Sequence, residues 1–266
     1  RSCLVGSEMC IRDRVNSMSE SGFLLIADIS GYTEFVKLHN LAKKPIFGAA
    51  LAKGFESHAT TIVADLLETV IDEVEPALRL NKLEGDAAFF FSSDKIGSTS
   101  GDEIVELMAR ANAAFNKKLS DLAFVQACGC EPCTQSKNLR LKICAHKGNF
   151  SLNTIRNFEE LSGEDVILTH RMLKNDIESS EYWLVTDAFH KTLNIDNKKK
   201  FTKITQNLES FDKVKLNFLE LGSPEPRNES VEKRSRAYNW IRQAGYFSSA
   251  MSVSYTHLRA HETRPY

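Results

Sequence analysis

The sequence predicts an α+β protein, a sandwich in which helices pack on one face of an antiparallel-rich sheet. Strand-like and helix-like segments follow in the order β-α-α-β-β-α-β-α-β-α-β-β, which mixes hairpins with crossovers. The 266 residues are 42% hydrophobic and 26% charged, an ordinary composition for a globular domain with a buried core. The net charge of −1 argues against a nucleic-acid partner, and no apolar run approaches the roughly 18 residues of a membrane span.

We expect both ends of the chain to be non-native. The chain begins with Arg1, and the first plausible start is Met18, directly before an apolar strand. Both terminal segments resemble peptides translated from sequencing-adapter DNA; the alternative is that they are genuine but disordered. Without a secretory signal, the expected location is the cytoplasm. The expected boundaries are a non-native extension at 1–17, a domain at 18–222, a linker and C-terminal segment at 223–249, and a non-native tail at 250–266.

The first half of the domain is predicted to contain a strand, a long helix and a hairpin. Five apolar residues at 23–27 are too few for a helix and predict a buried strand. Apolar residues at helical spacing predict an amphipathic helix from Phe55 to about Val74. Two strand-like runs at 78–82 and 87–91 flank a Glu-Gly-Asp sequence and predict a hairpin with a tight turn.

Further helices and strands are expected after the hairpin. An amphipathic pattern predicts a helix at 102–124, and period-2 alternation predicts a strand with one buried face at 139–145. The remaining expected elements are a helix at 163–175, a strand at 182–185, a short helix at 187–193, and late strands at 201–204 and 214–221.

Two aspartates stand where a reaction could use them. Asp28 ends the first buried strand, and Asp86 follows Gly85 in the hairpin turn. If the two strands pair, both carboxylates meet at one rim of the sheet, where they could hold Mg²⁺ or Mn²⁺ with substrate phosphates. The alternative is that each is a turn residue, because Asp hydrogen-bonds nearby backbone in turns.

Four segments resemble, in order, the motifs of class III nucleotidyl cyclases, the catalytic domain of adenylate and guanylate cyclases. FLLIADISGYTEF at 23–35 resembles their first metal-binding motif, and KLEGDA at 82–87 resembles the second. LKICAHKG at 141–148 resembles an Arg-x-Gly-x-His-x-Gly strand, and LSGEDVILTHRM at 161–172 resembles a Gly-x-x-Val-Asn-x-Ala-x-Arg helix. The sequence is closer still to an uncharacterised bacterial cyclase-like family. The resemblance implies a ferredoxin-like, nucleotidyl cyclase-type sandwich.

The resemblance also implies roles for individual residues. Asp28 and Asp86 fall on the two metal-binding aspartates of the cyclases. Lys82 falls on the position that reads the purine, where lysine favours adenine. Gly31 and Gly85 belong to the same two motifs and are expected at the nucleotide site.

At other positions the match to the cyclase motifs is incomplete. Arg171 falls on the arginine that stabilises the transition-state phosphate, and Lys142 stands where a phosphate-binding arginine is expected. Lysine keeps the charge but loses the bidentate fork. Ile167 replaces the asparagine that orients the ribose, and loss of an orienting group can reduce activity by orders of magnitude. Active sites of the family form between two subunits, which implies a homodimer.

A cysteine cluster is the remaining candidate site. Cys128, Cys130 and Cys133 form a Cys-x-Cys-x-x-Cys sequence in a loop, and Cys144 or His146 on the next strand could complete a set of four ligands. Thiolates this close predict a structural Zn²⁺ site. A redox pair and free structural thiols are the alternatives.

Three functions are therefore in competition. The first is a cyclase that binds a purine nucleoside triphosphate with Mg²⁺ or Mn²⁺ and forms cyclic nucleotide, with cAMP favoured over cGMP. The second is a catalytically degenerate domain that binds nucleotide or regulates a partner. The third is another metal-dependent phosphotransfer enzyme that uses the same two aspartates.

Overall fold

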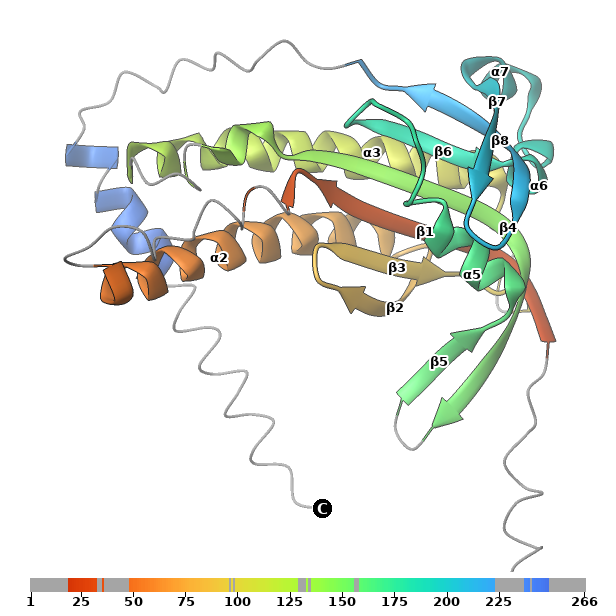
Figure 1. Cartoon of the computed structure of the whole chain (residues 1–266), viewed down its shortest axis with the longest axis horizontal. Coiled ribbons are helices and arrows are strands. Elements are labelled where there is room, and N and C mark those ends of the chain that lie inside the picture. Colours follow the sequence, from red (N-terminus) through yellow and green to blue (C-terminus); the bar gives the residue numbers. More distant parts are fainter. Residues whose placement is uncertain are drawn as a thin grey trace, which may run out of the picture.

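A single mixed sheet forms the centre of the molecule (Figure 1). The computed structural model describes residues 19–32, 35, 48–95, 97, 99–128, 133, 135–155, 158–222, 237–239 and 241–248. Eight strands lie in the order β2-β3-β1-β4-β6-β8-β7, with β5 paired to β4. The β4–β6 pair is parallel and the other pairs are antiparallel. The strands are β1 (Ser19–Ser30), β2 (Arg79–Glu84), β3 (Ala87–Phe91), β4 (Arg140–Ile155), β5 (Phe158–Ser162), β6 (Tyr182–Thr186), β7 (Thr202–Leu208) and β8 (Asp212–Glu220).

Strand β1 lies in the interior of the sheet. The five apolar residues that precede Asp28 are buried, and Asp28 itself pairs with Ala87 of β3 and Lys142 of β4. Gly22 marks a close approach between strands, because a Cβ there would lie 1.7 Å from the carbonyl oxygen of Ser92. The register of β1 is therefore fixed from both neighbours, and it determines what surrounds Asp28.

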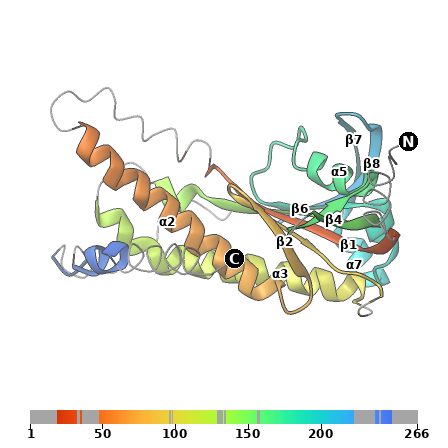
Figure 2. The ribbon, with the colours of Figure 1, turned by 90° about the horizontal axis from the view of Figure 1, so that it is seen from below.

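Two long helices cover one face of the sheet (Figure 2). These are α2 (Gly48–Val74) and α3 (Gly101–Asp121). Leu25 of β1 packs with Leu66 of α2 and Met108 of α3 in one core cluster. The predicted α+β sandwich, with helices packed on an antiparallel-rich sheet, is confirmed.

Helix α5 (Glu164–Arg171) lies on the opposite face (Figure 2). Its Val166 belongs to a second core cluster with Leu24 and Ile26 of β1 and Phe89 of β3. The prediction that helices cover one face only is wrong for this helix. The physical reason is that β1 is apolar at consecutive positions, so both of its faces must be covered.

The structure adds elements that the sequence patterns did not predict. The predicted strand at 139–145 continues as β4 to Ile155 and pairs back with β5. The predicted hairpin is confirmed by β2 and β3, which form an antiparallel pair. The remaining helical elements are η3 (Leu122–Cys128), η4 (Ser136–Asn138), α6 (Asp187–Lys191) and α7 (Ile195–Lys200), of which η4 and α7 were not predicted.

Part of the C-terminal segment returns to α2. Residues 241–248 are helical, and Tyr246 and Phe247 pack against the core cluster of α2 and α3. The ring of Phe247 stacks on His58 with centroids 3.6 Å apart. The hydroxyl of Tyr246 donates a hydrogen bond to Asp65 Oδ2 at 2.9 Å. The described part of the C-terminal segment is therefore packed on the domain.

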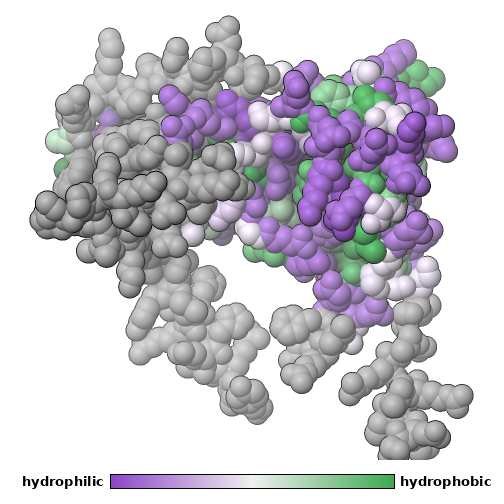
Figure 3. Space-filling view, in the orientation of Figure 1, coloured by the Kyte–Doolittle hydropathy of each residue, from purple (hydrophilic) through white to green (hydrophobic). Residues whose placement is uncertain are grey.

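The described surface is mainly hydrophilic on the face that Figure 3 shows, with apolar residues scattered over it. Within the described ranges, the large hydrophobic side chains that are exposed are Leu83, Ile167, Ile195, Tyr238 and Ile241. No helix in the described part of the chain has the length and apolar character to cross a membrane.

Candidate functional site

Asp28 and Asp86 lie together at one rim of the sheet. Asp28 is near the end of β1, and Asp86 stands in the turn between β2 and β3. Strand β3 pairs Asp28 with Ala87, the residue that follows Asp86. The amide of Ile29 donates a hydrogen bond to the carbonyl oxygen of Asp86 at 3.1 Å. Strand pairing thus brings the two aspartates together, as the sequence predicted.

Both chain turns beside these aspartates contain glycine for a conformational reason. Gly31 has a φ of 91° and Gly85 has a φ of 69°, in the left-handed region that other residues seldom adopt. No atom lies within 4 Å of a Cβ built on Gly85, so the backbone angle alone requires glycine there. The two glycines shape the rim, and their expected part in nucleotide binding stays a prediction.

The two carboxylates are held in an environment that disfavours charge. Burial, and then the negative charge of Asp86, raise the pKa of Asp28 to about 6, although Lys142 opposes the shift. Burial also raises the pKa of Asp86. The folded chain therefore disfavours ionisation of both carboxylates.

Lys142 is the cation beside this pair. It lies opposite Asp28 in the register of β1 and β4, and its Nζ is 5.5 Å from the centroid of the Tyr182 ring. The Tyr182 hydroxyl accepts a hydrogen bond from Asn175 Nδ2 at 2.7 Å, which holds the ring in place. The structure therefore places Lys142 next to the carboxylates, and its phosphate-binding role stays a prediction.

Lys82 occupies a separate part of the same face, between two glutamates. Its Nζ is 3.1 Å from Glu84 Oε1 and 3.3 Å from Glu160 Oε1. Burial lowers the pKa of Lys82, but the hydrogen bonds to the two carboxylates outweigh it and the net pKa is raised. Strand pairing sets Glu84 opposite Ala87, which is itself opposite Asp28. Lys82 lies two residues before Glu84 on β2, opposite Phe89.

These glutamates were not among the predicted site residues. The alternation of β2 does place Glu84 on the same side as Lys82, so a signal for Glu84 was present in the sequence. Glu160 lies on β5, which no pattern predicted, and only the fold brings it to Lys82.

His170 links helix α5 to the hairpin. Its Nδ1 is 3.2 Å from Glu84 Oε2, and its ring centroid is 4.5 Å from that of Phe89. Burial lowers the pKa of His170, and the charge of Glu84 offsets part of that effect. The carboxylate of Glu84 therefore contacts Lys82 through one oxygen and His170 through the other.

Arg171 and Ile167 do not join the aspartates within this chain. Arg171 Nη1 is 2.5 Å from Glu209 Oε2, at the turn between β7 and β8. Ile167 is 50% exposed on α5. The predicted transition-state arginine thus lies on the same face as the site but is paired elsewhere.

The strand motif of β4 has a structural role. His146 Nδ1 is 2.7 Å from Thr186 Oγ1, and its Nε2 is 3.1 Å from Asp165 Oδ1. A Cβ on Gly148 would lie 2.3 Å from His146 Nε2, so glycine leaves room for this pair. Asp165 also accepts a hydrogen bond from the Asn149 amide at 2.6 Å. These contacts fix the N-terminal turn of α5 to the sheet.

The cysteine prediction receives no support from the described residues. Cys130 and the side chain of Cys128 lie outside them, and Cys133 is buried with its Sγ 3.8 Å from His58 Nδ1. Cys133 packs in the core cluster of α2 and α3, whereas Cys144 packs in the cluster on the other face. The sheet therefore separates them, and the expectation that Cys144 completes a zinc site with Cys133 is wrong.

The aspartates fit a cation that is shared with a ligand. In the described part of the chain no group of three or more His, Cys, Asp or Glu side chains could hold a metal alone. Mg²⁺ is usually bound through one or two carboxylates together with substrate phosphates. Asp28 and Asp86 supply two hard oxygen donors whose mutual repulsion a divalent cation would relieve.

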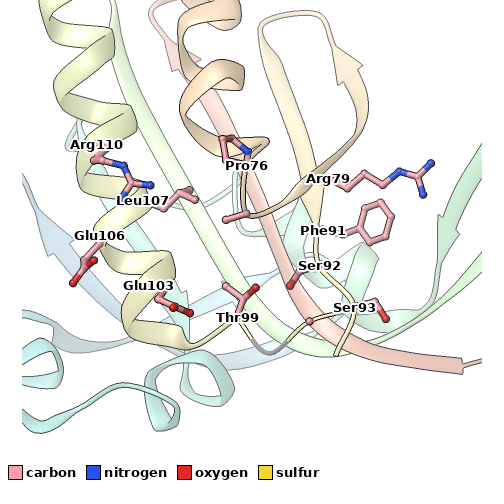
Figure 4. A pocket seen from close by; sticks show the side chains of 12 residues that line it. Pro76, Arg79, Phe91, Ser92, Ser93, Thr99, Glu103, Glu106, Leu107 and Arg110 are labelled. Carbon is pink, nitrogen blue, oxygen red and sulfur yellow. The ribbon is translucent and has the colours of Figure 1, made fainter. Parts of the chain in front are cut away.

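Two cavities are lined in part by the helices of the opposite face, and neither contains the aspartates. One of about 590 Å³ is lined by Pro76, Arg79, Leu107 and Arg110 and lies beside the far end of β3 from Asp28 (Figure 4). Another of about 400 Å³ lies between α2 and the β2–β3 hairpin. The aspartates stand outside both cavities.

Solved structures of nucleotidyl cyclases have this fold. The adenylyl cyclase CyaB from P. aeruginosa matches with a TM-score of 0.50 and 13% identity over 80% of this chain and 99% of that chain. The guanylyl cyclase Cya2 matches with a TM-score of 0.57 and 13% identity over 80% of this chain and 98% of that chain. The fold is therefore that of adenylyl and guanylyl cyclase domains.

Sequence comparison identifies the family. Residues 63–182 match a family described as a protein of unknown function, DUF2652. The uncharacterized protein Rv2561/Rv2562 from Mycobacterium tuberculosis (strain ATCC 25618 / H37Rv) is 33% identical over 161 residues, which are 60% of this chain and 74% of that protein. The chain belongs to the same family as this mycobacterial protein.

Proposed function

We propose that this protein is nucleotidyl cyclase-like and binds a purine nucleoside triphosphate with Mg²⁺ or Mn²⁺. The observation that carries the proposal is the meeting of Asp28 and Asp86 at one rim of a cyclase-type sheet. These two residues would hold the cation. When bound, the cation would offset the charge of the triphosphate and assist attack of the ribose 3′-hydroxyl on the α-phosphate, which gives a cyclic nucleotide.

The neighbouring residues supply the other contacts that a nucleotide needs. The ammonium of Lys142 lies beside the carboxylates and can donate to a phosphate oxygen. Lys82 and Glu160 present a donor and an acceptor for the edge of a purine. The resemblance at Lys82 favours adenine, so cAMP is the proposed product over cGMP. ATP and GTP are abundant in the cytoplasm, and a cytoplasmic location accompanies this function.

A homodimer is part of the proposal. Arg171 contacts Glu209 within its own chain, away from the aspartates. In a homodimer, the Arg171 side chain of a second copy could reach the nucleotide that is bound at Asp28 and Asp86. Mixing two inactive variants tests this: Asp28→Ala and Arg171→Ala should together restore a fraction of the product formed by the wild type. If ultracentrifugation shows dimers but the mixture forms no product, then Arg171 does not act on the site of a second subunit.

A binding function without turnover is the second candidate. Ile167 favours it, because an exposed apolar side chain stands where the cyclase motif has an orienting asparagine. Such a protein would bind the nucleotide and act as a regulatory module.

The deciding experiment incubates the full chain with ATP or GTP and Mn²⁺ and follows both binding and cyclic product. The test variants are Asp28→Ala and Asp86→Ala, and Asp72→Ala on the exposed side of α2 is the control. Product that depends on both aspartates supports the cyclase. Metal-dependent binding without product supports the second candidate. Nucleotide binding that neither aspartate substitution changes contradicts both candidate functions.

A further inference from the structure

Helix α5 is attached to the sheet near both ends by a contact between a histidine and a carboxylate. At its N-terminal end, Asp165 contacts His146 and the Asn149 amide of β4. At its C-terminal end, His170 contacts Glu84, the last residue of β2. The second attachment joins α5 to the hairpin that carries Asp86, two residues beyond Glu84.

The geometry at His170 defines the direction of the hydrogen bond. An ionised carboxylate only accepts, so the Nδ1 atom that faces Glu84 carries the proton. The ring also lies against Phe89, with centroids 4.5 Å apart and planes at 43°. Phe89 is fully buried on β3, so one rigid contact and one hydrogen bond together fix the imidazole.

The carboxylate of Glu84 contacts two side-chain nitrogen atoms at once. Its Oε1 is 3.1 Å from Lys82 Nζ, and its Oε2 is 3.2 Å from His170 Nδ1. When a purine takes the ammonium of Lys82, Glu84, whose side chain is 37% exposed, would lose one partner. The hydrogen bond from His170 keeps this carboxylate satisfied and in place.

We propose that His170 is a positioning residue of the nucleotide site. Through Glu84 it holds the β2–β3 hairpin so that Asp86 faces Asp28, and it leaves Lys82 available to the base. This inference rests on the proposed function. It assigns to His170 a task that neither the motifs nor the comparisons give it.

The test compares two substitutions that remove different halves of the His170 contact. His170→Phe keeps a ring against Phe89 and removes the donor, and His170→Gln keeps a donor and removes the ring. His190→Phe is the matched control, because His190 also combines a hydrogen bond, to Lys198, with a ring contact, to Phe201. The readouts are the Kd of Mn²⁺·ATP, amide hydrogen exchange of the hairpin without ligand, and the urea midpoint.

We expect His170→Phe to weaken Mn²⁺·ATP binding about tenfold, the low end of the effect of losing a group that orients metal ligands. Hairpin amides should exchange faster, and His170→Gln should recover part of both losses. The urea midpoint identifies a variant that fails to fold, and His170→Gln then carries the test.

Two outcomes would overturn the inference. One is hairpin exchange and Mn²⁺·ATP affinity in His170→Phe equal to those of the wild type. The other is His170→Gln as impaired as His170→Phe, which would assign the effect to packing. If the wild type itself does not bind Mn²⁺·ATP, the proposed function fails, while the exchange data still decide whether His170 holds the hairpin.

Discussion

Replacing Asp28 by Asn should stabilise the protein while it removes cation binding. Burial and the charge of Asp86 raise the pKa of Asp28 from 3.8 to about 6. A shift of roughly two units is about 3 kcal/mol, since each unit is about 1.4 kcal/mol. This is the upper limit of the free energy that the ionised carboxylate costs the folded state. Asn has the same shape and carries no charge, so it should recover part of that energy.

The pH dependence gives the sign of the effect. A raised pKa means that the folded state binds the Asp28 proton more tightly than the unfolded state does. The stability of the wild type therefore falls, through this group, as the pH rises from about 4 to about 6. The Asp28→Asn variant does not lose stability through this group as the pH rises. Its stability advantage should be largest above pH 6, at up to about 3 kcal/mol, and should vanish near pH 4.

Urea unfolding between pH 4 and 7.5, in buffer with EDTA, measures this difference. Asp72→Asn on the exposed surface of α2 is the control and should show no advantage at any pH. Adding Mn²⁺ and ATP should then stabilise only the wild type, by about 2.7 kcal/mol at a ligand concentration of 100 times Kd. An advantage of zero at pH 7, or one that does not change with pH, would refute the burial and repulsion inferred for Asp28.

Three further predictions concern the fold. Gly22→Ala should destabilise by more than about 2 kcal/mol, because its Cβ would lie 1.7 Å from a backbone carbonyl oxygen, whereas Gly97→Ala, with open space around it, should have little effect in thermal unfolding. Phe247→Ala should cost about 3 kcal/mol and speed hydrogen exchange of residues 241–248, while Ile241→Ala, at a position 66% exposed, should leave both unchanged. Cys144 is buried, and burial raises the pKa of its thiol, so this thiol should resist alkylation until the protein unfolds. Mass spectrometry of the Cys144 peptide measures the reaction, and labelling in native buffer would contradict that burial.

The parts of the site that the sequence predicted are those set by local pattern. Asp28 follows a short apolar run, and Asp86 stands in a Gly-containing turn between two strand-like runs, so pairing of adjacent strands was enough to place them. The same holds for Lys142, because alternation along β4 puts it on a definite face. The strand period and a tight turn locate these residues on their elements, but the meeting of Asp28 and Asp86 also required β1 to pair with β3, which the sequence could only assume.

The contacts that were missed depend on residues far apart in the chain. Glu160 reaches Lys82 across 78 positions, through a strand with two acidic residues that shows no apolar run. His170 reaches Glu84 only because α5 packs on the second face of the sheet. No local pattern encodes such distances. The five consecutive apolar residues of β1 did contain the signal for two covered faces, and they are the observation that should have predicted α5 opposite α2 and α3.

The position of Ile167 allows turnover to be separated from folding. Ile167 is 50% exposed, and α5 is held by Asp165 and His170 at its two ends, so Ile167→Asn should change the urea midpoint little. If a missing orienting amide is what limits chemistry, this variant should form cyclic nucleotide at least about tenfold faster than the wild type, since positioning dominates phosphoryl transfer. Ile195→Asn, at an exposed position on α7, is the control for a polar substitution away from the site. Unchanged product with intact Mn²⁺·ATP binding would show that the departure from cyclase chemistry extends beyond this one side chain, and it would favour the binding function over the enzyme.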